Sequence, residues 1–156
     1  TRLASLNDSY CISMAFWNGM PNDARATTGW LLSNDYPHAI SQSGEHLGIS
    51  GTDALPGRLM FQKGLSEPVV GKTEIPRWKW NHLLLVKDGK RLRVYLNQNP
   101  APEIDVAIQA SGSPEIATYF IGGRSDQQSN FEGRIDEVAV FKGVPETLIP
   151  AKKTAP

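Results

Sequence analysis

The sequence contains one pair of adjacent acids, Asp136 and Glu137, that invites comparison with catalytic carboxylates. Cleavage of a glycosidic bond needs two carboxylates on opposite sides of that bond. Neighbouring residues in a regular strand point to opposite faces of a sheet, so this pair is not such a constellation, and Glu132 does not complete one. We interpret the pair as structural acids at a bulge, where the apolar period shifts between Ile135 and Val138.

The three histidines and the single cysteine do not form a catalytic or metal-binding motif. His38, His46 and His82 lie in unrelated sequence contexts, and no nucleophile elbow accompanies them. We interpret His82 as a packed or edge residue of a strand, and no third ligand is spaced to join the other two histidines at a zinc ion. Cys11 alone excludes an internal disulfide, and we interpret it as an inert buried thiol. The sequence therefore carries no catalytic signature.

Two polar loops and one tryptophan are the candidates for ligand binding. Sugar rings are bound by aromatic faces and by planar polar groups on loops, and residues 18–25 and 124–130 have this polar composition, although both are also typical of ordinary solvated turns. Trp78 lies between two basic residues and is expected to be exposed, whereas Trp17 and Trp80 are expected in the core. The candidate binding residues here are Asp23, Arg25, Trp78, Arg124, Asp126, Gln127 and Asn130.

Positive charge is concentrated in residues 77–93, although the 16 Lys and Arg balance the 16 Asp and Glu in the whole chain. This stretch holds six basic residues and one acid, Asp88. Arg91 and Arg93 share the solvated face of a predicted strand, and arginine presents a planar fork to sulfate or carboxylate. The stretch therefore suggests an anionic polysaccharide as ligand. The alternative is a solvated strand face whose charges prevent edge-to-edge pairing.

Length and composition indicate one folded domain. The 156 residues are 40% hydrophobic with zero net charge, which argues against a disordered chain and against a nucleic-acid binder. The longest apolar run has four residues, far below the roughly 20 that cross a bilayer. We expect a domain over residues 1–150 and a tail or linker over 151–156. Because no initiator methionine is present, we expect a piece of a longer chain.

The elements that position these residues are predicted to be β-strands. Fourteen glycines and eleven prolines separate short apolar runs, and residues 10–17 alternate with period two. Asp88 and Gly89 form a tight-turn signal between two strands. No segment resembles a long helix. A two-sheet antiparallel sandwich is therefore expected, with strands over residues 10–17, 29–33, 46–50, 58–62, 69–72, 80–87, 91–97, 104–108, 118–122 and 134–141.

Three segments taken together match a known pattern: residues 12–17, the hairpin over 80–97, and residues 121–123 followed by 131–141 with the ending Phe-x-Gly-x-Ile-Asp-Glu-Val. In order and spacing, residues 10–145 resemble the laminin-G-like, concanavalin A-like jelly roll. The resemblance implies an all-β, two-sheet antiparallel jelly roll. It also implies carbohydrate binding, adhesion or an accessory role beside a catalytic domain, although the fold hosts hydrolases and lyases too.

The combined prediction is a non-catalytic carbohydrate-binding or adhesion module of a larger extracytoplasmic protein, secreted or on the cell surface. Its expected partner is a polysaccharide or glycan, together with neighbouring domains, and neither nucleic acid nor membrane insertion is expected. The alternatives are a protein-interaction or spacer domain that pairs an exposed sheet edge, and a polysaccharide hydrolase or lyase. The resemblance further implies a structural Ca²⁺ held by Asp136, with Asp8 or Asp126 as a further ligand.

Overall fold

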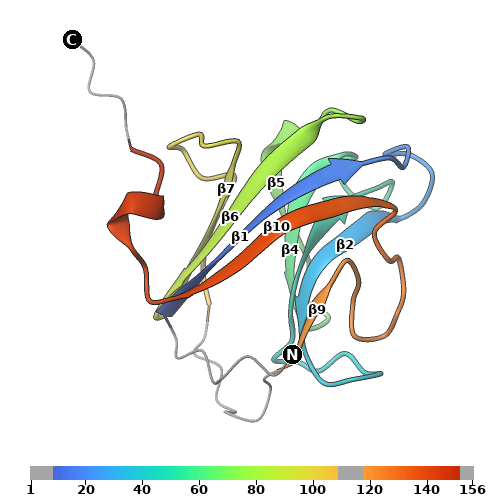
Figure 1. Ribbon diagram of the computed structural model, residues 1–156. Coiled ribbons are helices and arrows are strands. Elements are labelled where there is room, and N and C mark those ends of the chain that lie inside the picture. Colours follow the sequence, from blue (N-terminus) through green and yellow to red (C-terminus); the bar gives the residue numbers. More distant parts are fainter. Residues whose placement is uncertain (1–8, 109–117, 152–156) are drawn as a thin grey trace.

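The computed structural model describes residues 9–108 and 118–151, which form an all-β sandwich with one short 3₁₀ helix (Figure 1). All ten predicted strands occur, with ends that differ from the predicted ones by no more than two residues. The elements are β1 (Ser9–Asn18), β2 (Thr27–Asn34), β3 (Glu45–Ser50), β4 (Arg58–Lys63), β5 (Val69–Glu74), β6 (Trp80–Asp88), β7 (Arg91–Leu96), β8 (Ile104–Ala107), β9 (Tyr119–Ile121), β10 (Gly133–Lys142) and η1 (Glu146–Leu148).

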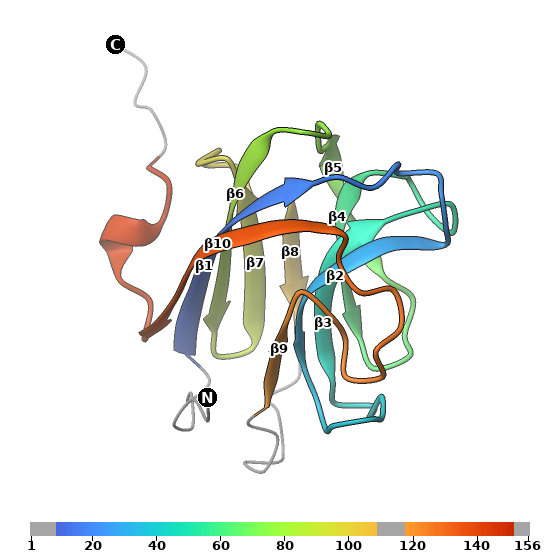
Figure 2. The ribbon, with the colours of Figure 1, turned by 45° about the vertical axis from the view of Figure 1, so that its right-hand side comes forward.

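The strands form two five-stranded antiparallel sheets that pack face to face (Figures 1 and 2). The first sheet has the strand order β10-β1-β6-β7-β8, and the second has the order β5-β4-β3-β2-β9. The predicted tight turn joins β6 to β7, and Gly89 there has a φ of +58°, which a residue without a Cβ adopts without strain. The predicted jelly-roll sandwich is confirmed.

The inner faces of both sheets bury one continuous core, because apolar residues alternate along the strands with the period of the pleat. In β1, Tyr10, Ile12, Met14 and Phe16 all point into this core and are almost fully buried. The partners from the second sheet are the large apolar residues of β2, β3 and β4. Residues at odd positions of β1 point to the outer face of the first sheet, which is the face turned away from the second sheet.

One ion pair crosses the core between the two sheets. The Lys87 Nζ of β6 lies 2.7 Å from Glu45 Oε1 of β3, and both side chains are almost fully buried. Tyr10 and Tyr119 pack edge to face beside this pair, with ring centroids 6.2 Å apart. Burial raises the pKa of Tyr119 to about 12 and raises that of Tyr10 well above its ordinary value. Removing one partner of such a pair leaves a buried charge uncompensated.

A carboxylate joins the two open edges of the sandwich. Glu103, in the segment before β8, accepts hydrogen bonds from the backbone amides of Lys72 and Thr73 in β5, at 2.7 and 2.8 Å. The Thr73 hydroxyl donates to the other oxygen at 2.7 Å. Burial raises the pKa of Glu103, but the bonds from Thr73 and Lys72 outweigh that effect and hold the pKa below its usual range. Glu103 therefore replaces the strand neighbour that the outer edge of β5 lacks.

A second apolar cluster lies on the outer face of the first sheet. Cys11, Leu84, Val86 and Tyr95 are buried there. Their cover comes from Phe141 and from residues 143–150, called here the C-terminal strap, which follow β10 and contain η1 (Figure 2). The prediction that Cys11 is a buried thiol is confirmed. The strap leaves the opposite end of this outer face uncovered.

Candidate functional site

Three tryptophans gather on the uncovered end of that outer face, where β1 ends and β6 begins. Trp17 and Trp80 are cross-strand partners in the register of these two strands. Trp78 precedes β6, and its backbone N–H donates to the Asn18 carbonyl at 3.0 Å. Trp78 is 54% exposed and Trp80 is 51% exposed. We call Trp17, Trp78 and Trp80 the tryptophan surface.

Two of the three tryptophans are covered by each other and by arginines. The rings of Trp17 and Trp78 are tilted by 36° with centroids 6.2 Å apart. The Arg77 guanidinium lies 4.5 Å from the Trp78 ring, and that of Arg134 lies 5.2 Å from the Trp17 ring. Trp80 has no such ring or cation partner in the described part of the chain. Trp80 is therefore the one member of the tryptophan surface whose ring no described aromatic or cationic group covers.

The backbone of Trp78 is in an unusual conformation. Its φ is +64°, in the left-handed region that bulky residues rarely occupy. Such a residue costs on the order of 1–3 kcal/mol and persists only where surrounding contacts impose it. Glycine or asparagine would occupy the position at less cost, and the indole itself is half exposed. The strain is therefore associated with presenting this side chain rather than with packing a core.

Within the described residues, the cations beside the tryptophan surface have no carboxylate partner. No carboxylate in the described segments lies within ion-pair distance of Arg77, Lys79 or Arg134. Arg77 donates instead to the Gly19 carbonyl at 2.9 Å, which fixes its guanidinium over Trp78. The positive charge beside the tryptophans is therefore available to an anion.

The two predicted loops meet through Arg25. Its guanidinium donates to the Asn130 carbonyl at 2.7 Å and forms an ion pair with Glu132 at 3.0 Å. Further bonds run from Arg25 to the carbonyls of Thr27 and Thr28 at the start of β2. These bonds engage the guanidinium of Arg25, which therefore holds the two loops together. Asp23, in the same loop, is exposed.

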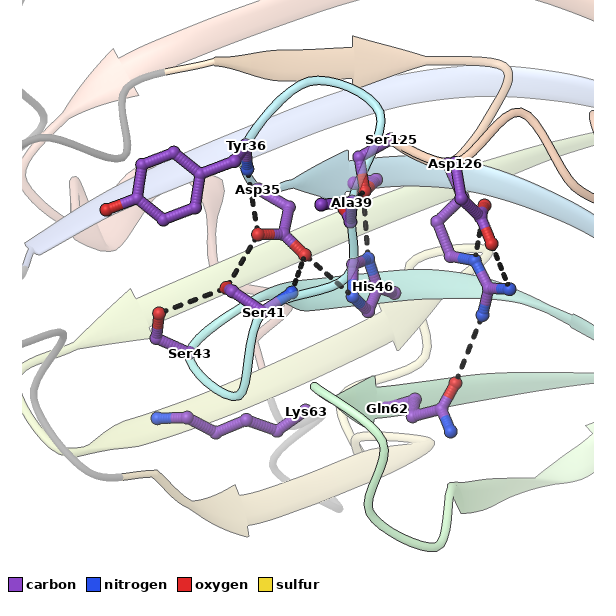
Figure 3. A network of polar contacts seen from close by, with 12 residues as sticks. Asp35, Tyr36, Ala39, Ser41, Ser43, His46, Gln62, Lys63, Ser125 and Asp126 are labelled. Carbon is purple, nitrogen blue, oxygen red and sulfur yellow. Dashed lines mark hydrogen bonds and ion pairs between the residues drawn. The ribbon is translucent and has the colours of Figure 1, made fainter.

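Arg124 and Asp126 belong to a polar network on the outer face of the second sheet (Figure 3). Two bonds of 2.9 and 2.8 Å join their side chains, and the Arg124 guanidinium lies 4.7 Å from the buried Trp30 ring. Burial raises the pKa of Asp126, but the bonds from Arg124 and its loop backbone hold it below its usual range. The Nη1 atom of Arg124 also donates a hydrogen bond to Gln62 Oε1 at 3.5 Å. Gln127 is exposed beside this network, with a φ of +61°.

Ser33, His46 and Asp35 meet in the same network, an arrangement that the sequence prediction missed; Figure 3 labels His46 and Asp35. Ser33 Oγ lies 2.8 Å from His46 Nδ1, and His46 Nε2 lies 3.5 Å from Asp35 Oδ2. All three residues are fully buried, so no substrate reaches the hydroxyl. Asp35 accepts bonds from the Tyr36 amide and from Ser41, which fixes the loop after β2. The group is structural.

The basic face predicted at Arg91 and Arg93 is partly neutralised. Arg91 forms two bonds of 2.7 Å to Asp105 of β8. These bonds hold the pKa of Asp105 below its usual range. Arg93 is half-buried, and Asp105 is also its cross-strand partner. The two arginines lie on β7, separated from the tryptophan surface by the rest of β6.

Asp136 lies on the outer face of β10, opposite Ala15. The register of β1 and β10 shifts here and Glu137 has a φ of +52°, which confirms the predicted bulge. Asp136 Oδ1 accepts a bond from the Glu137 amide at 2.8 Å. Asp8 lies outside the described residues, and among those described no group of three acidic, histidine or cysteine side chains is placed to hold a metal. The calcium ligand therefore stays a prediction.

The interpretation of Trp80 as a core residue was wrong, and Trp17 is only half-buried. Both alternate correctly with the inward-facing residues of their strands, but the outer face on which they lie is covered only at the other end. The prediction that Trp78 is exposed is confirmed. Nothing in the period-two pattern distinguishes a covered outer position from an open one.

The sequence of residues 2–146 matches the family model of the concanavalin A-like lectin/glucanases superfamily. The chain belongs to this superfamily. The match spans most of the 156 residues, so the resemblance to a laminin-G-like jelly roll is confirmed. None of the curated protein sequences compared with the chain matches it.

Solved structures with the same fold are distant in sequence. The chain is similar to domain 4 of AbnA, an extracellular arabinanase from Geobacillus stearothermophilus in complex with arabinotriose (TM-score 0.60, 20% identity, 90% of this chain and 63% of that chain). It is also similar to the CBM40 of the Ruminococcus gnavus IT-sialidase bound to α2,3 sialyllactose (0.65, 14%, 93% and 82%). A third is a SAP-like pentraxin from Limulus polyphemus (0.54, 19%, 90% and 67%). At these identities the likeness establishes the fold.

Two further findings bear on context. The chain covers only 39% of a carbohydrate-binding protein from Bacteroides ovatus, described as putative, with a TM-score of 0.64 and 14% identity. In the described segments, no helix has the length and apolar character needed to span a membrane.

Proposed function

We propose that this domain is a non-catalytic carbohydrate-binding module of an extracytoplasmic protein, and that it binds its glycan at the tryptophan surface. The observation that carries the proposal is the pair of half-exposed indoles, Trp78 and Trp80, on a rigid sheet end. The apolar face of a pyranose packs against such rings. Oligosaccharide complexes of the similar arabinanase domain and CBM40 support the same ligand class.

Within this surface, the sugar stacks on the Trp80 ring. The adjacent pair of Trp17 and Trp78 limits the orientation of that sugar. Trp17 and Trp78 cover part of each other, and their outer faces are occupied by Arg134 and Arg77. Trp80 stands beside this stack with an open face. The stack forms a side wall that limits how a sugar ring lies on Trp80.

The finer proposal is that the glycan is anionic. The guanidinium groups of Arg77 and Arg134 lie over tryptophan rings, and neither has a carboxylate partner in the described chain. Arginine binds carboxylate and sulfate groups through two parallel hydrogen bonds. This location differs from the one predicted at Arg91, whose fork is already used by Asp105.

The domain's acids and its serine support a binding role rather than a catalytic one. Asp136 and Glu137 lie at a bulge, with the Asp136 carboxylate bonded to the next amide. Ser33, which lies next to the buried His46 and Asp35, is fully buried. Neither arrangement offers an accessible pair of catalytic groups.

The test is binding of the purified domain to a polysaccharide panel by affinity electrophoresis, followed by calorimetry with the retained species. The panel comprises hyaluronan, chondroitin sulfate and polygalacturonate as anionic members, and arabinan and xylan as neutral ones. Trp80→Ala is expected to weaken binding roughly 30-fold, which corresponds to about 2 kcal/mol for a buried aromatic anchor. Tyr36→Ala, an exposed aromatic at the other end of the sandwich, is the control. Equal affinity of Trp80→Ala and wild type contradicts the proposal.

The anionic preference is tested separately with Arg134→Gln and Arg91→Gln. Arg134→Gln should weaken binding to the anionic members and flatten its dependence on salt, because screening acts on the lost charge. Arg91→Gln should leave binding unchanged. A larger effect of Arg91→Gln would instead favour the basic strand face of β7. Equal affinity for neutral and anionic members would restrict the conclusion to stacking.

A further inference from the structure

The outer face of the first sheet continues from the tryptophans into a second row of side chains. The register places Asp136 of β10 and His82 of β6 on either side of Ala15 in β1. Ala15 is two residues from Trp17, and His82 is two residues from Trp80. Because side chains two residues apart point to the same face of a strand, both rows face the same solvent.

This second row has the dimensions of a sugar subsite. Neighbouring strands lie about 4.8 Å apart, so the backbones at Asp136 and His82 are separated by roughly 10 Å. The residue between them is alanine, which leaves only a methyl group on the floor. A separation of roughly 10 Å is of the size spanned by one pyranose ring with a hydrogen bond of about 2.8 Å on each side.

The two flanking groups retain free hydrogen-bonding capacity. Asp136 is exposed, and its Oδ1 atom accepts a bond from the Glu137 amide, whereas its Oδ2 atom has no partner among the described residues. His82 is half-buried, and its Nε2 atom lies 2.9 Å from Ser13 Oγ, which orients the ring. The Nδ1 atom of His82 has no side-chain partner among the described residues. Asp136 Oδ2 and His82 Nδ1 are therefore the atoms of these two residues, on either side of Ala15, that have no side-chain partner in the described part of the chain.

The row is bounded on both sides. The tryptophan surface lies on one side, and on the other side the cluster around Leu84 and Cys11 lies beneath the C-terminal strap. A glycan on this face is thus confined to the strip between the two.

From this geometry we propose that Asp136 and His82 bind the hydroxyl groups of a sugar unit seated over Ala15, next to the unit that stacks on Trp80. The inference rests on the proposed function. The unit over Ala15 is neutral, because the Asp136 carboxylate repels a second carboxylate or sulfate, whereas Arg77 and Arg134 take the acidic group at the tryptophan surface. The ligand class is therefore a glycan in which acidic and neutral units alternate.

The experiment compares hyaluronan oligosaccharides, which alternate acidic and neutral units, with polygalacturonate oligosaccharides of equal length, in which every unit is acidic. Calorimetry is expected to give at least tenfold tighter binding of hyaluronan to the wild-type domain. Asp136→Asn should weaken hyaluronan binding about tenfold and reduce the discrimination. Ala15→Val should weaken both by filling the floor. The matched controls are Glu137→Gln on the same bulge and Ala107→Val on β8, with thermal unfolding as the check on folding.

Each outcome decides the inference. It is overturned if Trp80→Ala abolishes binding while Asp136→Asn, His82→Gln and Ala15→Val bind as wild type does, and the proposed function then stands. Equal wild-type affinity for the two oligosaccharides also overturns it. Loss of binding on chelation with EDTA, together with loss in Asp136→Asn, would assign Asp136 to a calcium ion instead. If Trp80→Ala has no effect, or no member of the panel binds, the proposed function fails and the inference with it.

Discussion

Substitution of the buried His46 should remove a pH dependence of stability that the folded protein has between pH 7 and pH 5. The pKa of His46 is lowered from 6.5 to about 4, chiefly by burial; Asp35 and Asp126 act against this decrease and Arg124 contributes to it. The unfolded chain therefore binds a proton in this range that the folded chain does not. Stability is highest above pH 6.5 and decreases as the pH falls toward 4.

The magnitude follows from these two pKa values. Each pH unit between them costs about 1.4 kcal/mol of unfolding free energy, so lowering the pH from 7 to 5 removes about 2 kcal/mol. In a domain of this size, that corresponds to a decrease in Tm of about 4–8 °C. The carboxylates Glu103, Asp105 and Asp126 have pKa values below their usual range. These carboxylates therefore become protonated, and lose the interactions that depend on their charge, only at a pH below the range in which His46 acts.

The assay is urea unfolding at pH 7, 6 and 5 at constant ionic strength. His46→Gln is expected to be less stable than wild type at pH 7, because the bond to Ser33 changes, but to lose about 2 kcal/mol less on acidification. His38→Gln, an exposed position in the neighbouring loop, is the control and should retain the wild-type slope. The reasoning is refuted if wild type and His46→Gln have the same slope between pH 7 and pH 5.

Three further predictions concern contacts that hold the sandwich together. Lys87→Met should lower the free energy of unfolding, measured in urea, by about 3–5 kcal/mol. The double variant Lys87→Met/Glu45→Leu should recover most of that loss. No recovery in the double variant would contradict the ion pair. Glu103→Ala should cost about 1–3 kcal/mol and speed amide hydrogen exchange at the β5 edge, and unchanged exchange would argue against its role there. Leu148→Asp should detach the C-terminal strap, so maleimide should label Cys11 at least tenfold faster in the native protein, while equal rates would show that the strap does not protect the thiol.

The fold could be predicted from the sequence because the signals that specify it are local. Alternation in residues 10–17, the Asp-Gly turn before Lys90 and regularly spaced turn residues determine strands and hairpins without knowledge of their neighbours. The bulge at Asp136 was equally readable, because it shifts the apolar period within one segment. These features are encoded in adjacent residues, and the structure confirms them.

The site was less predictable because it depends on contacts between distant segments. Trp80 and Leu84 both point to the outer face of β6, yet Leu84 is buried only because the strap covers it. Ser33 and His46 meet because β2 and β3 pair in that register. Arg91 is neutralised by Asp105 of the next strand. In each case, strand order and register decide which side chains remain available.

The outer face of the first sheet thus divides along its strands into parts with different physical roles. Under the strap, apolar residues such as Leu84 stabilise the sheet by burial, whereas toward the other end of β6 His82 is half-buried and Trp80 is 51% exposed. Along β1 and β6, the side chains on the outer face change from buried to exposed within a few residues. The backbone remains a regular strand throughout. A rigid sheet holds the exposed side chains in fixed rows, so little ordering entropy opposes a ligand. Binding at this face therefore requires no rearrangement of the core, and variants that alter Trp80 or Ala15 should change affinity while leaving the unfolding free energy close to that of the wild type.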